Sequence, residues 1–312
     1  MPNIDNLGNV LIRSDLNVPI KNGEITDYYR ILKSVEIVKK ISNKSRTITF
    51  VSHLGRPDGK DLKLSLRPVA VKMSEILDKE VHFIEETYGE KVERQIETSE
   101  SKIFLLENLR YEKGEIENDK KFSKQITKPF DSYIFDAFGA AHREHASVVS
   151  FGENLKSFQG PLMDKEIKEL DKLLKNNESG YSVLLGGAKI SDKLNLIEKL
   201  LPKVENLMVG GGMCFTLLKA LGYEIGKSLL EESFISKAEE LLNSDNGQKI
   251  ILPTDFGVTD SIDSSDRVNI KISDFKNNHI GIDIGPQTVS DFEKILNKSK
   301  NIFWNGPMGI FE

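Results

Sequence analysis

The chain alternates short apolar, β-branched runs with longer segments whose apolar residues recur every three or four positions. In the first half the apolar runs are NVLIRSDLN, TITFVSH, VHFI, IFLLEN and YIFDAF, at residues 9–17, 47–53, 81–84, 103–108 and 133–138. Amphipathic stretches lie between them, around residues 30–42, 67–78 and 118–128. This alternation is typical of βα units on a parallel sheet, so we predict an α/β fold.

The second half repeats the alternation. Its apolar runs are YSVLLGG, ENLMVGGG, KIILP, HIGIDIG and NIFWNGP, at residues 181–187, 205–212, 249–253, 279–285 and 301–307. Helical periodicity separates them near residues 190–203, 230–244 and 287–298. We therefore predict a second parallel-sheet domain rather than one large sheet, in line with roughly 150 residues per domain.

The junction between the two halves has its own composition. The segment SFGENLKSFQGPL, residues 150–162, carries glycines and a proline, and after it Ile167, Leu170, Leu173 and Leu174 repeat at helical spacing. We predict a first domain at residues 1–160, a hinge and linker helix at 161–178, and a second domain at 179–312.

Composition excludes several classes of protein. The chain of 312 residues is 38% hydrophobic and 29% charged, as ordinary globular proteins are. No apolar run approaches the ~18 residues that span a bilayer, and the first residues lack a basic, apolar secretory start. A single cysteine, Cys214, forbids an internal disulfide and any multi-thiolate metal site. We expect a cytoplasmic protein without a resident metal.

Charge is unevenly distributed. The net charge of −5 disfavours a nucleic-acid or membrane partner, and residues 1–150 carry equal numbers of basic and acidic residues. Eight of the nine arginines nevertheless fall in that half. Because the guanidinium group binds carboxylate and phosphate through paired hydrogen bonds, the first half is the better candidate for a small anionic ligand.

Polar side chains gather where the predicted strands of the first half end. Open parallel sheets bind ligands beyond the carboxyl ends of their strands. The residues at these ends are Asp15, Asn17, His53, Arg56, Asn108, Arg110, Asp136, His142, Arg143 and His145, and Arg30 opens the first predicted helix. Taken alone, each of these residues is as consistent with a surface or structural role as with ligand binding. Together they predict a pocket for a small molecule with several negative charges.

The second half carries glycine runs and paired lysines. GGAKISDK is not a P-loop, and GGGMCF is not G-x-G-x-x-G, so neither run is specific alone. Lys189 and Lys193 lie four residues apart at the start of a predicted helix, on one side of its first turn. Two cations at the positive end of a helix dipole favour a bound anion, so we predict a nucleotide phosphate site, against the alternative of two solvated lysines.

Nine ordered segments of the chain resemble the phosphoglycerate kinase family. They are RSDLNVP, ITDYYRI, SHLGRPDGK, LLENLRYEKGE, DAFGAAHREHAS, LLGGAKISDK, VGGGMCFTLLKALGYEIGKSLLEE, GIDIGP and FWNGPMGIFE. The resemblance implies two Rossmann-like domains joined by a hinge helix and closing during catalysis. It also implies reversible phosphoryl transfer between 1,3-bisphosphoglycerate and ADP, giving 3-phosphoglycerate and ATP in glycolysis by a phosphotransferase with a carboxyl acceptor.

The resemblance also implies the site residues. It assigns the phosphoglycerate site to Asp15, Leu16, Asn17, Arg30, His53, Leu54, Gly55, Arg56, Arg110 and Arg143. It assigns the nucleotide site to Lys189, Lys193, Gly210, Gly211, Gly212, Gly281, Asn305 and Glu312. Arg30, Lys189 and Lys193 would act on the transferred phosphoryl group. The expected ligands are ATP or ADP, with Mg²⁺ carried by the nucleotide, and the expected state is a monomer.

The end of the chain departs from the family pattern, which continues beyond FWNGPMGIFE with two further glycine-rich stretches. We therefore expect a second domain truncated at its C-terminus, and an inactive chain that only binds phosphoglycerate is the alternative function. A nicotinamide dehydrogenase is a third hypothesis. It is disfavoured because no G-x-G-x-x-G follows the first strand.

Overall fold

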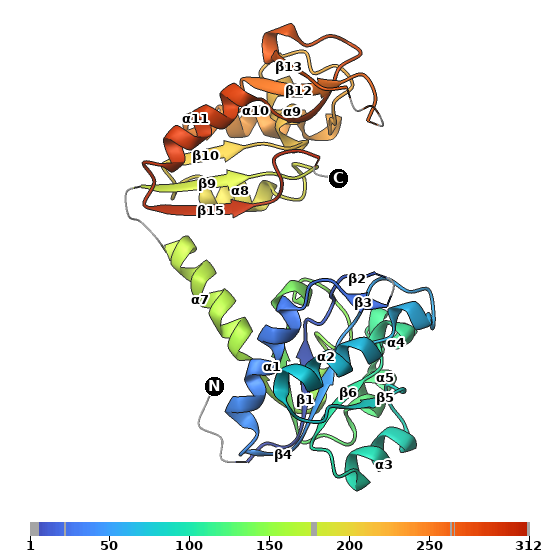
Figure 1. Cartoon of the computed structure of the whole chain (residues 1–312). Coiled ribbons are helices and arrows are strands. Elements are labelled where there is room, and N and C mark those ends of the chain that lie inside the picture. The colour runs from blue at the N-terminus through green and yellow to red at the C-terminus, as the bar shows by residue number, and fades with distance from the viewer. Residues whose placement is uncertain (1–5, 22, 176–179, 263, 265, 311–312) are drawn as a thin grey trace. The chain divides into compact units, whose positions relative to one another are not determined.

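The computed structural model describes residues 6–21, 23–175, 180–262, 264 and 266–310. The chain divides into two compact units, Met1–Glu169 and Leu170–Glu312, and the division falls inside helix α7 (Pro161–Lys175) (Figure 1). Helix α7 covers most of the segment predicted as hinge and linker, and residues 176–178 of that segment lie outside the described residues. The hinge role stays a prediction.

The first unit is built on a six-stranded parallel sheet with the order β5-β6-β4-β1-β7-β8. Its strands are β1 (Gly8–Ser14), β4 (Ser45–Val51), β5 (His82–Ile84), β6 (Ile103–Leu106), β7 (Ser132–Asp136) and β8 (Lys156–Gln159), and β2 (Ile20–Lys21) with β3 (Glu24–Ile25) forms a small antiparallel pair. Its helices are α1 (Tyr29–Ile41), α2 (Arg67–Leu77), α3 (Glu90–Thr98), α4 (Lys113–Ile116), α5 (Lys120–Thr127) and α6 (Phe151–Asn154). All five strands predicted here are confirmed.

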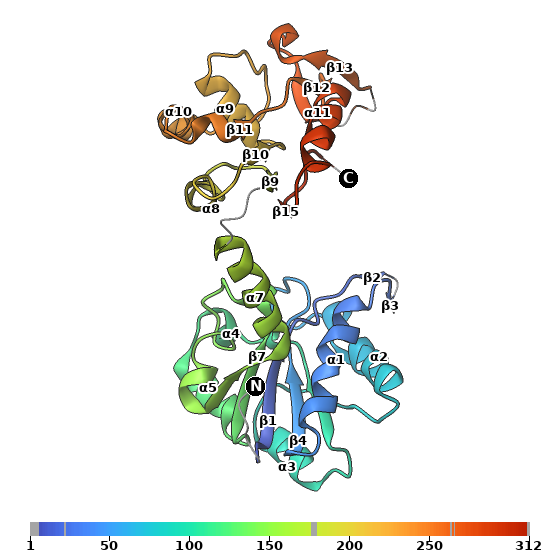
Figure 2. The ribbon, with the colours of Figure 1, turned by 90° about the vertical axis from the view of Figure 1, so that its left-hand side faces the viewer.

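Both faces of this sheet are covered, as expected of a parallel sheet. Successive residues of β1 point to opposite faces. Val10 and Ile12 pack in a cluster with residues of α1 and α2, whereas Leu11 belongs to a second cluster with residues of α3 and α5. Figure 2 shows α1 and α2 on one side of the sheet and α5 on the other. The apolar run of β1 is therefore buried on both sides.

The second unit holds a four-stranded parallel sheet with the order β11-β10-β9-β15. Its strands are β9 (Tyr181–Leu185), β10 (Asn206–Val209), β11 (Ile250–Ile251) and β15 (Asn301–Asn305), and its helices are α8 (Leu194–Leu200), α9 (Met213–Ala220), α10 (Ile235–Leu242) and α11 (Pro286–Leu296). One face of the sheet packs against residues of α8, α9 and α10, and Phe292 of α11 packs against the other.

One predicted parallel strand of the second half is wrong in direction. HIGIDIG forms β14 (Ile280–Ile284), which pairs antiparallel with β12 (Asp255–Thr259) beside β13 (Val268–Lys271) in a separate three-stranded sheet. The residues of β14 alternate between apolar and small or polar types. That period of two is typical of a half-covered antiparallel strand, whereas strands buried on both faces are apolar throughout.

The strand orders define two topological switch points, which are the positions where the order of strands along the sheet reverses direction. In the first sheet β1 lies between β4 and β7, and in the second β9 lies between β10 and β15. Loops that leave neighbouring strands in opposite directions open a crevice at their carboxyl ends, where ligands of open α/β sheets bind. Among the described residues, no helix is long and apolar enough to cross a bilayer.

Candidate active site

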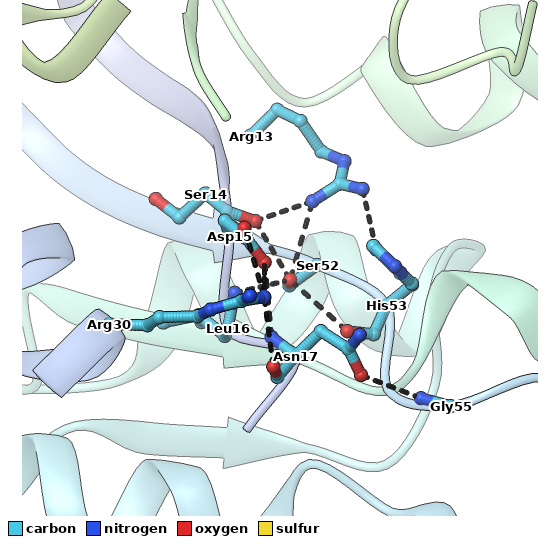
Figure 3. Close-up of polar contacts among 9 residues, drawn as sticks. All are labelled: Arg13, Ser14, Asp15, Leu16, Asn17, Arg30, Ser52, His53 and Gly55. Carbon is cyan, nitrogen blue, oxygen red and sulfur yellow. Dashed lines mark hydrogen bonds and ion pairs between the residues drawn. The ribbon is translucent and has the colours of Figure 1, made fainter. Parts of the chain in front are cut away.

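Asp15 and Asn17 follow the carboxyl end of β1 and hold Arg30 over it (Figure 3). Arg30, in the first turn of α1, donates from Nη1 to Asp15 Oδ1 at 3.1 Å and to the backbone oxygen of Asn17 at 3.1 Å. The Asn17 side chain accepts from the backbone N–H of Gly55 at 2.9 Å. The Arg30 side chain is 53% exposed, so its other nitrogens remain open to a ligand.

His53 follows β4 and is held by the buried Arg13 of β1 (Figure 3). Arg13 Nη2 lies 2.8 Å from His53 Nδ1, and its Nη1 lies 3.3 Å from Ser52 Oγ. Burial, reinforced by Arg13, Arg110 and Arg143, lowers the pKa of His53 to about 2. The ring is therefore neutral, and because Nδ1 accepts from Arg13, its proton resides on Nε2 as a donor.

Arg56, Arg110 and Arg143 come together around an open pocket of about 310 Å³, lined also by Pro57, Ile116 and His145. Among the residues that the structure describes, no carboxylate lines this pocket. Burial and the neighbouring Arg143 and Arg13 guanidinium groups lower the pKa of Arg110. Cations this close together repel one another, so a bound anion would relieve the repulsion. The structure thus brings four of the predicted strand-end residues, Arg56, Arg110, Arg143 and His145, around one pocket, and their role in binding a ligand stays a prediction.

A buried carboxylate, Glu115, supports the loop that carries Arg143. Glu115 is fully buried and accepts from both the backbone N–H (2.9 Å) and Oγ (2.6 Å) of Ser147. The same Ser147 Oγ accepts from Arg13 Nε at 2.9 Å. Burial alone would raise the pKa of Glu115, but hydrogen bonds from His145 and Ser147 and the charge of Arg13 lower it overall. The carboxylate is therefore ionised among the cations.

Several residues predicted to bind the ligand instead stabilise the loops around the pocket and do not line it. Leu16 and Leu54 are buried, and the backbone N–H and oxygen of Leu54 pair with the side chain of Asn108. Asp136, placed among the ligand-binding strand ends by the sequence, instead accepts from the backbone N–H groups of Leu162 and Met163 at the start of α7. It is a helix cap, because its carboxylate satisfies donors that have no partner within the helix.

Sequence reasoning missed the buried supports Arg13, Ser52, Glu115 and Ser147. Arg13 carried a usable signal, because a charged residue inside an apolar strand must find partners when it is buried. Ser147 and Glu115 belong to separate segments, and nothing in the sequence connects them. Their pairing arises only from the fold.

In the second unit the glycine runs interlock at the carboxyl ends of the parallel strands. The backbone N–H of Gly187 donates to Pro307 O at 3.0 Å, and that of Gly211 donates to Met308 O at 2.9 Å. Gly211 has φ +67°, and a Cβ there would lie 2.7 Å from the backbone nitrogen of Gly187. The loops after β9, β10 and β15 therefore pack backbone against backbone, which only glycine permits.

An apolar slot of about 360 Å³ opens beside these loops. Its walls include three of the predicted nucleotide residues, Gly211, Gly212 and Gly281. Phe215, Leu229, Ile282 and several other apolar side chains line it too, and Lys227 and Asp283 are its charged residues. An apolar slot of this size suits a heterocyclic base. Gly210 and Asn305 lie in the neighbouring loop and strand end and do not line the slot.

Contrary to the sequence prediction, the structure does not place the two lysines in the first turn of a helix. Helix α8 begins at Leu194, and residues 191–193 form a turn before it, so Lys189 and Lys193 do not share the first turn of a helix. Lys193 donates from Nζ to Asn305 Oδ1, which joins two predicted nucleotide residues. Lys189 is exposed and has no ion-pair partner in the part of the chain that the structure describes. Glu312, also predicted here, lies outside the described residues.

The described ranges hold no cluster of three or more His, Cys, Asp or Glu side chains able to bind a metal ion. An arginine-lined pocket beside one parallel sheet and a glycine-walled apolar slot beside the other mark the chain as an α/β protein with sites suited to small anionic and heterocyclic ligands.

A family model described as phosphoglycerate kinase matches residues 4–312. The phosphoglycerate kinases of Dictyoglomus turgidum and Thermosipho africanus are 45% and 43% identical over 97% of this chain, which spans 78% and 77% of their lengths. The chain belongs to the phosphoglycerate kinase family, as the nine segments predicted. This membership leaves no support for the dehydrogenase hypothesis, and no comparison specifically favours an inactive chain.

Solved structures agree with this assignment. The phosphoglycerate kinase of Coxiella burnetii matches with a TM-score of 0.78 at 35% identity, over 99% of this chain and 79% of its own. That of Pyrococcus horikoshii matches with a TM-score of 0.82 at 29% identity, over 99% and 80%. The predicted α/β fold with parallel sheets is thus confirmed.

Proposed function

We propose that this chain catalyses the glycolytic reaction of its family, the reversible phosphoryl transfer between 1,3-bisphosphoglycerate and ADP that gives 3-phosphoglycerate and ATP. The observation that carries the proposal is the pocket of Arg56, Arg110 and Arg143, which is lined by no carboxylate of the described part of the chain. 3-Phosphoglycerate carries a phosphate and a carboxylate, the two groups that arginine binds in bidentate fashion.

The substrate site we propose follows the strand ends of the first unit. Asp15 and Asn17 hold Arg30 and the backbone of Gly55, and His53 donates from Nε2. The three pocket arginines bind the phosphate, whereas Leu16 and Leu54 fix the loops from below. Arg30 neutralises the charge of the acyl phosphate when the phosphoryl group resides on phosphoglycerate.

The nucleotide site we propose lies in the second unit. The base occupies the slot at Gly211, Gly212 and Gly281, and the phosphates extend toward Lys189 and Lys193. Gly210 and Asn305 support this route through the loop packing and the contact of Asn305 with Lys193. The role of Glu312 rests on the family resemblance alone. Mg²⁺ enters as part of the nucleotide substrate, bound to phosphate oxygens.

The chemistry needs no general base. In the direction that consumes ATP, a carboxylate oxygen of 3-phosphoglycerate attacks the γ-phosphorus, an acyl O–P bond forms, and the bond from phosphorus to the ADP oxygen breaks. The carboxylate is already ionised near pH 7. The remaining tasks are alignment of the reacting atoms and neutralisation of charge on the transferred group, which arginine and lysine perform.

Family resemblance also supports a monomer, which sedimentation analysis of the purified chain would test. The single cysteine fits a reducing compartment such as the cytoplasm, and fractionation of cells that express the chain would test that location.

The decisive experiment combines binding and turnover. We expect 3-phosphoglycerate to bind the purified chain in a calorimetric titration, and Arg56→Ala to weaken binding about tenfold, since a hydrogen bond to a charged group contributes roughly 1.5–3 kcal/mol. Arg94→Ala, an exposed arginine of α3, is the matched control and should change nothing. ADP release from MgATP should depend on 3-phosphoglycerate. Equal affinity in both variants, or ADP release that ignores 3-phosphoglycerate, would overturn the proposal.

A further inference from the structure

Ser191 lies between Lys189 and Lys193 in the sequence and donates two hydrogen bonds to Glu231. Its backbone N–H donates to Glu231 Oε2 at 3.1 Å, and its Oγ donates to Oε1 at 2.6 Å. On the other side of the turn, Ile190 is buried in the core at 1% exposure. A carboxylate that accepts both donors of one residue fixes the position and the orientation of its backbone.

Glu231 is itself fixed to the glycine loop. Its backbone N–H donates to Thr216 Oγ1 at 3.2 Å, and Thr216 is buried on α9, the helix that follows Gly210–Gly212. Burial alone would raise the pKa of Glu231, but the hydrogen bonds from Ser191 lower it overall, so the carboxylate is ionised and accepts at both oxygens. The lysine turn is thereby fixed relative to one wall of the slot.

The first unit holds its cationic loop in the same manner. Glu115 accepts from the backbone N–H and the Oγ of Ser147 at 2.9 and 2.6 Å, close to the pocket that His145 and Arg143 line. Two unrelated segments thus use one bidentate carboxylate–serine arrangement next to phosphate-binding cations.

We propose that Glu231 is a positioning residue that sets Lys189 and Lys193 at the distance from the slot that the nucleotide phosphates require. The inference rests on the proposed nucleotide site. It differs from a simple counter-charge role, in which Glu231 would only offset the positive charge of the lysines.

Two substitutions separate these roles. Glu231→Gln removes the charge and one acceptor, whereas Glu231→Asp keeps the charge on a shorter side chain that does not reach both donors. If Glu231 positions the lysines, both variants weaken MgADP binding about tenfold. If it is only a counter-charge, Glu231→Gln tightens MgADP binding and Glu231→Asp leaves it unchanged, which would overturn the inference. Glu232→Gln, at the exposed neighbouring residue, is the matched control and should have no effect.

Adenosine, which has no phosphate, distinguishes positioning from a structural role. Calorimetry of the full chain should give unchanged adenosine affinity in both Glu231 variants, and a parallel loss of adenosine and MgADP binding would contradict the inference. Ser191→Ala, which keeps the backbone bond, is the milder variant should Glu231 variants fail to fold, and it should weaken MgADP alone about threefold. If Lys193→Ala leaves MgADP affinity unchanged, the nucleotide assignment itself fails. If Lys193→Ala weakens it and the Glu231 and Ser191 variants do not, only the inference fails.

Discussion

His53 combines deep burial with three neighbouring arginines, and this combination determines its charge. At 7% exposure and with a pKa lowered to about 2, it stays neutral under all physiological conditions. Any pH dependence of substrate binding near neutrality must therefore come from the ligand or from other groups. His53 instead acts on folding stability, because an unfolded chain would protonate it near pH 6.5.

The first prediction concerns the pH dependence of stability. Between pH 6.5 and about 2 the unfolded chain binds a proton at His53 that the folded chain does not, so the free energy of unfolding falls as pH falls. From pH 7 to pH 5 this site alone should remove about 2 kcal/mol. His53→Asn keeps an acceptor for Arg13 without a titrating ring. Urea unfolding at both pH values should show a smaller pH effect in the variant; equal losses would contradict the prediction.

The second prediction concerns Arg30, whose guanidinium contacts both Asp15 and the backbone of Asn17. Arg30→Ala should weaken 3-phosphoglycerate binding about tenfold and leave MgADP binding unchanged, because a charge-assisted contact to the substrate is lost. Arg30→Lys keeps the charge but not the fork, and should recover only part of the affinity. Calorimetric titration of the unmodified chain and of both variants measures these affinities. Full recovery in the lysine variant would show that charge alone matters.

At the level of residues, the sequence predicted which arginines line the pocket better than it predicted the residues that support them. Arg56, Arg110 and Arg143 meet because parallel strands end on one edge of a sheet, and this follows from strand assignment alone. The contact of Glu115 with Ser147 depends on how two loops pack. Periodicity carries no information on such packing.

At the level of elements, Gly281 shows how β14 and α9 enclose the slot. A Cβ on Gly281 would lie 2.1 Å from Cζ of the Phe215 ring, a distance at which the ring must move. Phe215 packs against Phe256 and Phe275, with ring centroids 4.9 and 6.0 Å away, so it has little room to move.

The third prediction follows from this contact. Gly281→Ala should lower the free energy of unfolding by about 1–3 kcal/mol, as overpacking does, and should weaken adenosine binding because the wall of the slot shifts. Gly152→Ala is the control, since its nearest neighbour would be Ser157 Oγ at 3.4 Å. Denaturant unfolding and calorimetry provide the measurements. Two variants of equal stability would argue against a tight contact at Gly281.

The start of α8 is a feature that hydrophobic periodicity in the sequence did not predict. Ile190, Leu194 and Ile197 follow a helical spacing, yet the helix begins only at Leu194. Ser191 gives its backbone N–H to Glu231, which precedes α10 in the chain. A contact between distant segments thus holds this turn, and local pattern cannot reveal it. The antiparallel pairing of β14 was missed for a similar reason, because its partner β12 was not recognised as a strand.

At the level of the whole molecule, each candidate ligand site lies within one unit. The fourth prediction is that Lys193→Ala weakens MgADP binding and leaves 3-phosphoglycerate binding unchanged, the converse of Arg30→Ala. Each ligand at 100 times its dissociation constant should stabilise its own unit by about 2.7 kcal/mol. Hydrogen exchange should therefore slow around residues 53–56 with 3-phosphoglycerate and around 210–213 with MgADP. Protection of the same residues by both ligands would contradict the two-site assignment.

The strand order also has a consequence for synthesis on the ribosome. The first strand of each sheet, β1 and β9, lies in the interior of its sheet, and one of its two partners, β7 or β15, comes late in the same unit. Neither switch point exists until that late strand has left the exit tunnel. Until then the apolar edges of β1 and β9 remain open to wrong pairing. The geometry that places each switch point beside an early strand and a late one thus makes that region of each sheet depend on protection while the chain is growing.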